Sequence, residues 1–227
     1  MGILSSLYCR GLKAIPFCSE SLDCLAENMH VTSILKNDKC QRYYRVRRLQ
    51  ACSLSYVDIV LFDTKYLDTL QPDELLAVGA HEFTHIIKKH GIKKFSRIFV
   101  PSMVVVAVVG IFVFINARVF SHILFFNSFG AGLSSLFVAI LCFLPALVIS
   151  QYVNAKWHRQ LETECDLNAV KFANGEAMIS ALYKASKFRP INTKSLEYRL
   201  GPRLYLSLEQ RINYLRTAIV KKSESVT

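Results

Sequence analysis

Two long uncharged apolar runs constrain the fold of this chain more than any other feature of its sequence. The runs cover residues 98–117 and 133–153, and neither contains a charged side chain. A helix needs about 20 predominantly apolar residues to cross a bilayer, so each run is long enough to cross once. Proline, present here as Pro101 and Pro145, is tolerated in such helices. The sequence predicts a transmembrane helical hairpin, and the alternative is a helical hairpin buried in a water-soluble domain.

Positive charge is concentrated beside these two runs. The net charge is +11, and 52% of the residues are hydrophobic. Lysine and arginine flank the runs at 88–97 and 154–159, whereas the turn over 118–132 holds only Arg118. By the positive-inside rule, this distribution predicts an integral, multi-pass membrane protein with two spans and both termini in the cytoplasm. A lipid bilayer is therefore the expected partner, and the absence of a nucleic-acid-binding motif argues against nucleic acid.

The hairpin divides the chain into four predicted segments. Residues 1–40 are expected to be helical or irregular, 41–97 to form a small antiparallel sheet and a helix, 98–153 the hairpin, and 154–227 further helices. β-branched and aromatic residues between positions 43 and 62 predict the sheet. The fold class is then α+β, mainly α, with the hairpin inserted within one domain. Seven cysteines without a CxxC pair favour a reducing compartment over a disulfide framework.

The motif HEFTH, residues 81–85, points to metal-dependent chemistry. Side chains four positions apart share one face of a helix, so His81 and His85 can hold one zinc ion. Glu82 is turned about 100° from His81 and can reach a water at the open position of the metal. This placement predicts that Glu82 is a general base. Catalytic zinc usually has three protein ligands, so a third ligand must come from elsewhere.

The helix that carries this motif is predicted to span residues 72–90. Pro72 suits its first turn, and Gly91 suits the position just after its end. His90 lies five positions after His85, about 140° around such a helix, so the same helix cannot present both side chains to one metal. His90 is interpreted as a residue that interacts with the negative end of the helix dipole.

The third ligand is expected just after the second apolar run, in the segment RQLETECD. Glu162 and Asp166 are four positions apart and share a helix face, so Glu162 can bind the metal while Asp166 hydrogen-bonds a ligand histidine. Glu164 is turned about 200° from Glu162 and is the weaker choice. The alternative is a solvated acidic patch at the start of a helix.

HEFTH followed, after two apolar runs, by Glu162-x-x-x-Asp166 resembles the integral-membrane zinc peptidases that include the heat-shock protease HtpX and the CAAX prenyl protease. The resemblance covers residues 50–216 and includes QACS, LLAVGAHEFTH and LSLEQRI. Tyr205 and Leu206 stand where the family usually has His-Pro. The resemblance implies a zincin-like membrane metalloprotease domain, a gluzincin with one zinc ion per chain.

Further roles follow from this resemblance. Arg159 lies three residues before the glutamate ligand, as in the family. Tyr205, Arg159 and Arg211 are candidate donors to the oxyanion of the reaction, and an arginine paired with Asp166 is the structural alternative. An extended substrate is expected to bind along the exposed edge of a strand. This substrate edge is predicted to consist of Gln50, Ala51, Cys52 and Ser53.

These features predict a zinc-dependent, membrane-bound endopeptidase that cleaves membrane-associated or misfolded proteins at the cytoplasmic face. The alternatives are a CAAX-type prenyl-protein protease, a catalytically inactive zinc-binding scaffold or adaptor, and a membrane-anchored binding protein without metal. A structural zinc site has no use for a base, so Glu82 argues against the scaffold. An intramembrane protease is disfavoured because lysines follow the motif directly. The partner is a protein or peptide substrate, and the sequence makes no prediction of oligomeric state.

Overall fold

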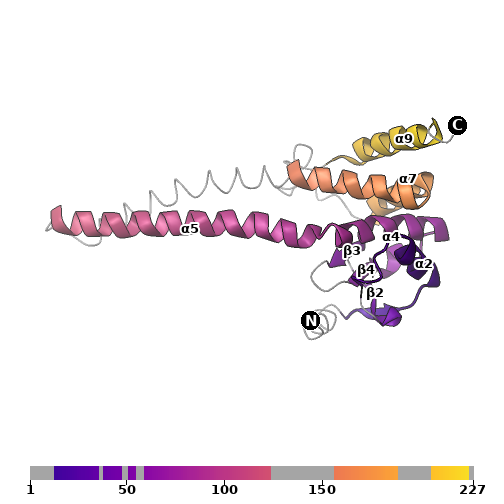
Figure 1. Cartoon of the computed structure of the whole chain (residues 1–227), viewed down its shortest axis with the longest axis horizontal. Helices are drawn as coiled ribbons and strands as arrows, with labels where there is room; N and C mark the ends of the chain where they lie inside the picture. The colour runs from indigo at the N-terminus through magenta and orange to yellow at the C-terminus, as the bar shows by residue number, and fades with distance from the viewer. Residues whose placement is uncertain are drawn as a thin grey trace. The chain divides into compact units, whose positions relative to one another are not determined.

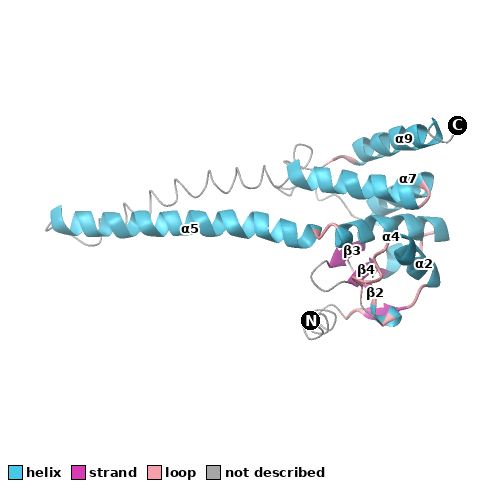
Figure 2. Ribbon diagram, in the orientation of Figure 1, coloured by secondary structure: helices cyan, strands magenta, loops and turns pink. Residues whose placement is uncertain are grey.

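A computed structural model describes residues 13–35, 38–47, 51–54, 59–123, 156–188 and 206–224. The chain separates into two compact units, one made of residues 1–92 with 158–227 and the other of residues 93–157. The first unit combines helices with a small sheet, which places it in the α+β class (Figures 1 and 2).

The sheet has four strands in the order β1-β2-β4-β3. The strands are β1 Ile15–Phe17, β2 Tyr43–Val46, β3 Ala51–Leu54 and β4 Ile59–Asp63. β3 and β4 form an antiparallel pair, but β2 runs parallel to β4. The predicted antiparallel sheet is therefore wrong in part. β2 pairs with β4 instead of the next strand along the chain, and β1 comes from a segment that was expected to be helical or irregular.

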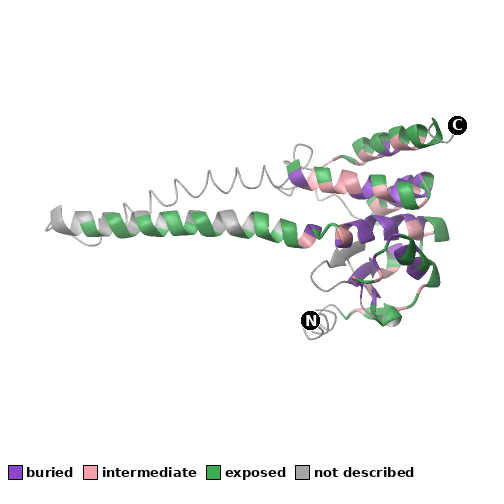
Figure 3. Ribbon diagram, in the orientation of Figure 1, coloured by how far each residue is buried: buried purple, intermediate pink, exposed green. Residues whose placement is uncertain are grey.

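The core of this unit lies where the helix α4, Pro72–Ile87, packs against the sheet and against the helix α2, Glu20–Asn28. Figure 3 shows α4 as largely buried. Phe83 of α4, Tyr43 and Phe62 of the sheet, and Leu22 of α2 are all fully buried. Gly79 permits the close approach of the two helices, because an added Cβ would lie 2.5 Å from the Cδ2 atom of Leu22.

On its other side, α4 contacts α7, Gly175–Phe188, and α7 in turn contacts α9, Leu208–Glu224 (Figure 1). The described part of the preceding helix covers residues 156–172. This helix ends at Phe172, and the Asn174 side chain caps the start of α7 by accepting a hydrogen bond from the Glu176 amide. A capping box precedes α9, in which the Ser207 amide donates to Oε1 of Gln210 at 3.0 Å and the Gln210 amide donates to Oγ of Ser207 at 3.2 Å.

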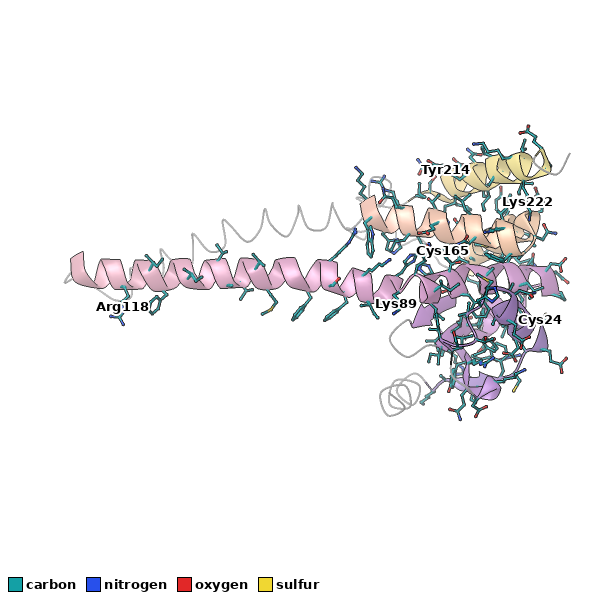
Figure 4. All side chains as sticks on the ribbon, in the orientation of Figure 1. Cys24, Lys89, Arg118, Cys165, Tyr214 and Lys222 are labelled. Carbon is teal, nitrogen blue, oxygen red and sulfur yellow. The ribbon has the colours of Figure 1, made fainter. Side chains whose placement is uncertain are left out.

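α4 ends earlier than predicted. It stops at Ile87, and α5, His90–Ile123, begins three residues later, so the expected stop at Gly91 is wrong. Lys89 separates the two helices with φ of 52°, a left-handed conformation that commonly ends a helix. Figure 4 labels Lys89 at this junction.

The first apolar run lies in α5, as a helix. Within the described parts of the chain, no helix reaches the combination of length and apolarity that a membrane crossing requires. The predicted transmembrane hairpin is thus not seen, and residues 133–153 lie outside the described residues. Cys18 is disulfide-bonded, whereas the cysteine pattern favoured a reducing compartment.

Candidate metal centre

The three donors expected at the metal site come together. His81 and His85 on α4 bring their Nε2 atoms to within 3.2 Å of each other. Glu162, on the helical segment 156–172, places Oε2 3.5 Å from Nε2 of His81 and Oε1 3.6 Å from Nε2 of His85. The carboxylate therefore faces both imidazoles across the interface between α4 and the later helix.

These separations fit a tetrahedral zinc site. Ligand atoms at roughly 2.0–2.1 Å from a tetrahedral ion lie roughly 3.3–3.4 Å from one another. The three pairs of donor atoms lie 3.2, 3.5 and 3.6 Å apart. Two imidazoles and one carboxylate also form the donor set of many catalytic zinc sites, which leave a fourth position open. The chain's own residues therefore fit this metal.

A second donor set competes with this assignment. One ligand atom each from His81, His85 and Cys165 lie within 4.8 Å of one another. A thiol binds metal as the thiolate. Burial raises the pKa of the Cys165 thiol far above its usual range, and the charges of Glu162 and Glu82 raise it further. Without a metal the thiol thus favours its protonated form, whereas Glu162 offers a charged carboxylate to both imidazoles.

Asp166 supports His81 from behind. Its Oδ1 lies 2.9 Å from Nδ1 of His81, so the carboxylate fixes the ring with Nε2 toward Glu162. Arg211 of α9 donates two hydrogen bonds to Asp166, of 2.8 Å from Nε and 2.7 Å from Nη2. Its Nη2 atom is also 3.7 Å from Oε2 of Glu162. Arg211 is thus paired with Asp166, and this pairing was the structural alternative to a role as an oxyanion donor.

The charges of the site prepare it for a cation. Burial alone would lower the pKa of His81, but its hydrogen bonds to Asp166 and Glu162 raise it to about 10. Burial and the nearby charge of His81 lower the pKa of His85 to about 3. Burial would raise the pKa of Glu162, yet the hydrogen bond and charge of His81, with Arg211, hold it well below its usual range. The pKa of Asp166 is lowered as well, so two carboxylates lie ionised beside the imidazoles, where a positive charge is favoured.

Two histidines that were not predicted to take part also lie at the site. His90 is buried, with Nδ1 2.9 Å from Nδ1 of His85, so its interpretation as a residue that interacts only with the helix end is wrong. The reason is the break at Lys89, which places His90 on a different helix from His85. His158 lies one turn before Glu162, with Nδ1 3.6 Å from its Oε1. The four-residue spacing of His158 and Glu162 could have predicted from the sequence that His158 lies beside Glu162. The turn at Lys89 has no such signal in the sequence.

The other predicted residues fall in different places. Glu164 pairs with Lys88 at 2.8 Å and has its other carboxylate oxygen 3.8 Å from Nε2 of His90. The described contacts of Arg159 are limited to its carbonyl, which accepts a hydrogen bond from Thr163. Tyr205 and Gln50 lie outside the described residues. Ala51, Cys52 and Ser53 lie in β3, at one edge of the sheet.

Two imidazoles and a glutamate on one buried helix, with a carboxylate from a later helix beside them, are the arrangement typical of metallopeptidases. The comparison with known families agrees with this class. The model of peptidase family M48 matches residues 21–218, and the chain belongs to that family. A search among curated proteins finds no matching relative.

Proposed function

We propose that this peptidase is a zinc-dependent endopeptidase whose metal ligands are His81, His85 and Glu162. The observation that carries the proposal is that the Nε2 atoms of His81 and His85 lie 3.2 Å apart, with one carboxylate oxygen of Glu162 3.5 or 3.6 Å from each. The ligands come from helices that are separated in the sequence by residues 93–157. Asp166 and Arg211 hold this arrangement in place from behind.

A zinc ion bound here would polarise the scissile carbonyl and lower the pKa of a water. Glu82 is next to His81 on the same helix and is buried. In the proposed reaction, the carboxylate of Glu82 takes the proton of the attacking water and then gives it to the leaving amine. By holding a metal in one position relative to Glu82, the proposed ligands His81, His85 and Glu162 would lower the entropic cost of the reaction.

The test compares the parent protein with the Glu82→Gln variant, both purified in detergent. Metal analysis should give one zinc ion per chain for each. Cleavage of casein should fall about 10²- to 10⁴-fold in the variant, the usual contribution of a general base. Glu209→Gln is a matched control, since Glu209 is exposed on α9. Equal cleavage by parent and variant would refute the role of Glu82, and a zinc-containing parent without activity would favour the inactive scaffold.

We also propose that an extended substrate binds along β3. This strand is at the edge of the sheet and contacts α4, the helix that carries the motif. An edge strand offers main-chain hydrogen bonds that are largely independent of substrate sequence, which suits cleavage of misfolded proteins. Cys52→Pro removes one main-chain donor and should raise KM for peptide cleavage relative to Cys52→Ala. An unchanged KM in both variants would rule the edge out.

A lipid bilayer is the proposed partner of α5. Large apolar side chains between Phe95 and Ile115 are 49–63% exposed, which is costly in water. Within the same unit, the Arg97 guanidinium lies 4.3 Å from the centre of the Trp157 ring, and both residue types are common at membrane interfaces. The protein should float with lipid vesicles after alkaline carbonate treatment, and recovery in the aqueous fraction would contradict the proposal. The two spans and the cytoplasmic orientation remain predictions.

A further inference from the structure

The two ligand imidazoles are both held at their Nδ1 atoms, but by different partners. His81 has the carboxylate of Asp166 at 2.9 Å. His85 has Nδ1 of His90 at the same distance, and the two rings are nearly perpendicular, at 80°. His90 thus occupies, relative to His85, the place that Asp166 occupies relative to His81.

The local backbone is shaped to bring His90 there. α4 closes with hydrogen bonds from the Lys88 amide to the Thr84 carbonyl and from the Lys89 amide to the Ile86 carbonyl, both 3.0 Å. Lys89 then adopts φ of 52°, which is unfavourable for a residue with a side chain. This turn allows His90, the first residue of α5, to fold back into the protein, where it is only 4% exposed.

The surroundings of His90 determine which of its nitrogens carries the proton. A metal ligand must present Nε2 without a proton, so His85 carries its proton on Nδ1 and donates it toward His90. His90 then accepts at Nδ1, which also lies 3.7 Å from Sγ of Cys165, and carries its own proton on Nε2. That atom faces the Glu164 carboxylate, with 3.8 Å between Nε2 and Oε2, an electrostatic contact longer than a hydrogen bond. Glu164 is in turn paired with Lys88 at 2.8 Å.

We propose that His90 is a positioning residue that holds His85 in the tautomer able to bind metal, with Glu164 favouring the required tautomer of His90. His90 acts through His85 and has no contact with substrate in this assignment. The proposal rests on the function proposed above, because it requires a metal at His81, His85 and Glu162. Partners that orient a ligand histidine typically contribute 10- to 100-fold to metal affinity.

The test measures zinc affinity by chelator competition at one fixed pH. His90→Phe keeps a ring of similar size but removes the acceptor, and should raise the Kd for zinc about 10- to 100-fold. His90→Asn should restore the affinity to within about threefold, because its amide oxygen can replace Nδ1 as an acceptor. Lys89→Gly is the control that keeps the left-handed turn, and it should match the parent.

Two further measurements separate positioning from a structural role. The visible spectrum of the cobalt-substituted protein should change in His90→Phe and return in His90→Asn, whereas the urea midpoint of the metal-free protein should not follow this order. Glu164→Gln, at a side chain 43% exposed, should also weaken zinc binding and provides the test if His90→Phe does not fold. Parent-like zinc affinity in His90→Phe, or in Glu164→Gln if His90→Phe does not fold, would overturn the proposal. A parent that binds no zinc would instead overturn the proposed function.

Discussion

At the scale of single residues, the charge state of a side chain matters for metal binding as much as its position does. Cys165 and Glu162 both lie near the two imidazoles. Burial keeps the thiol protonated by raising its pKa, whereas the neighbouring cations keep the carboxylate ionised by lowering its pKa. Under the proposed function, the chain would thus supply one charged oxygen ligand and two imidazoles, a donor set found in many catalytic zinc sites.

This difference in charge predicts that substitutions of Glu162 and Cys165 have different effects on the zinc content. Glu162→Gln removes the charged ligand and should reduce bound zinc to a small fraction of one ion per chain. Cys165→Ala should leave the zinc content at one ion per chain, since a protonated thiol is a poor ligand. Metal analysis after dialysis against a weak chelator gives the comparison. Loss of zinc in Cys165→Ala with retention in Glu162→Gln would reverse the assignment of the third ligand.

At the scale of elements, the central helix α4 depends on one small residue. Gly79 lies where α2 crosses α4, and Leu22 and Leu25 of α2 occupy the space that a side chain would need. An added methyl group would lie 2.5 and 3.4 Å from their Cδ2 atoms, and Leu22 is fully buried. The close packing of α2 against the motif helix therefore requires a glycine at position 79.

Gly79→Ala should consequently lower the free energy of unfolding by up to about 2 kcal/mol. Overpacking costs roughly 1–3 kcal/mol, and the better helix propensity of alanine returns up to about 1 kcal/mol. Urea unfolding measures the change. Leu22→Ala makes room for the methyl group, so the double variant should be more stable than the sum of the two single changes predicts. Gly110→Ala is the control, with no atom within 4 Å of its added Cβ.

Features that depend on local interactions could be predicted from the sequence, whereas features that depend on the tertiary fold could not. Spacing alone predicted the motif helix and the placement of Glu162 and Asp166 on one helix face, because each depends on neighbours within one turn. The parallel pairing of β2 with β4 was missed, since the choice of a strand partner is set by the tertiary fold. The break at Lys89 was missed because no sequence signal marks a lysine with positive φ.

At the scale of the whole molecule, the site-bearing unit is assembled from two separate stretches of chain. Residues before position 93 supply α4, and residues after position 157 supply α7 and α9. Glu74 joins the two parts, with Oε2 2.6 Å from Nζ of Lys184 and Oε1 2.6 Å from Oγ of Ser180. Tyr66 adds a third connection by donating a 3.0 Å hydrogen bond to the Ala181 carbonyl.

The connection through Glu74 predicts a specific dependence of stability on pH. Burial would raise the pKa of Glu74, but hydrogen bonds from Lys184, Ser180 and the Gln71 amide outweigh it and lower the pKa below 4.5. The folded state thus gains stability above pH 4.5 and loses it as the pH falls through the lowered pKa. Glu74→Gln should cost about 2 kcal/mol near neutral pH, and its difference from the parent should shrink in acid. A difference that stays constant with pH, measured by urea unfolding, would contradict this role.

The division of this unit also has a consequence for biosynthesis. A polypeptide leaving the ribosome displays both motif imidazoles while the codon for Glu162 is still untranslated. With the two proposed neutral ligands and no anionic one, the nascent segment would hold zinc weakly, and Lys184, which pairs with Glu74 of the motif helix, is also still missing. Under the proposed function, cleavage of neighbouring polypeptides begins only after translation has passed the insertion and the downstream helices have docked.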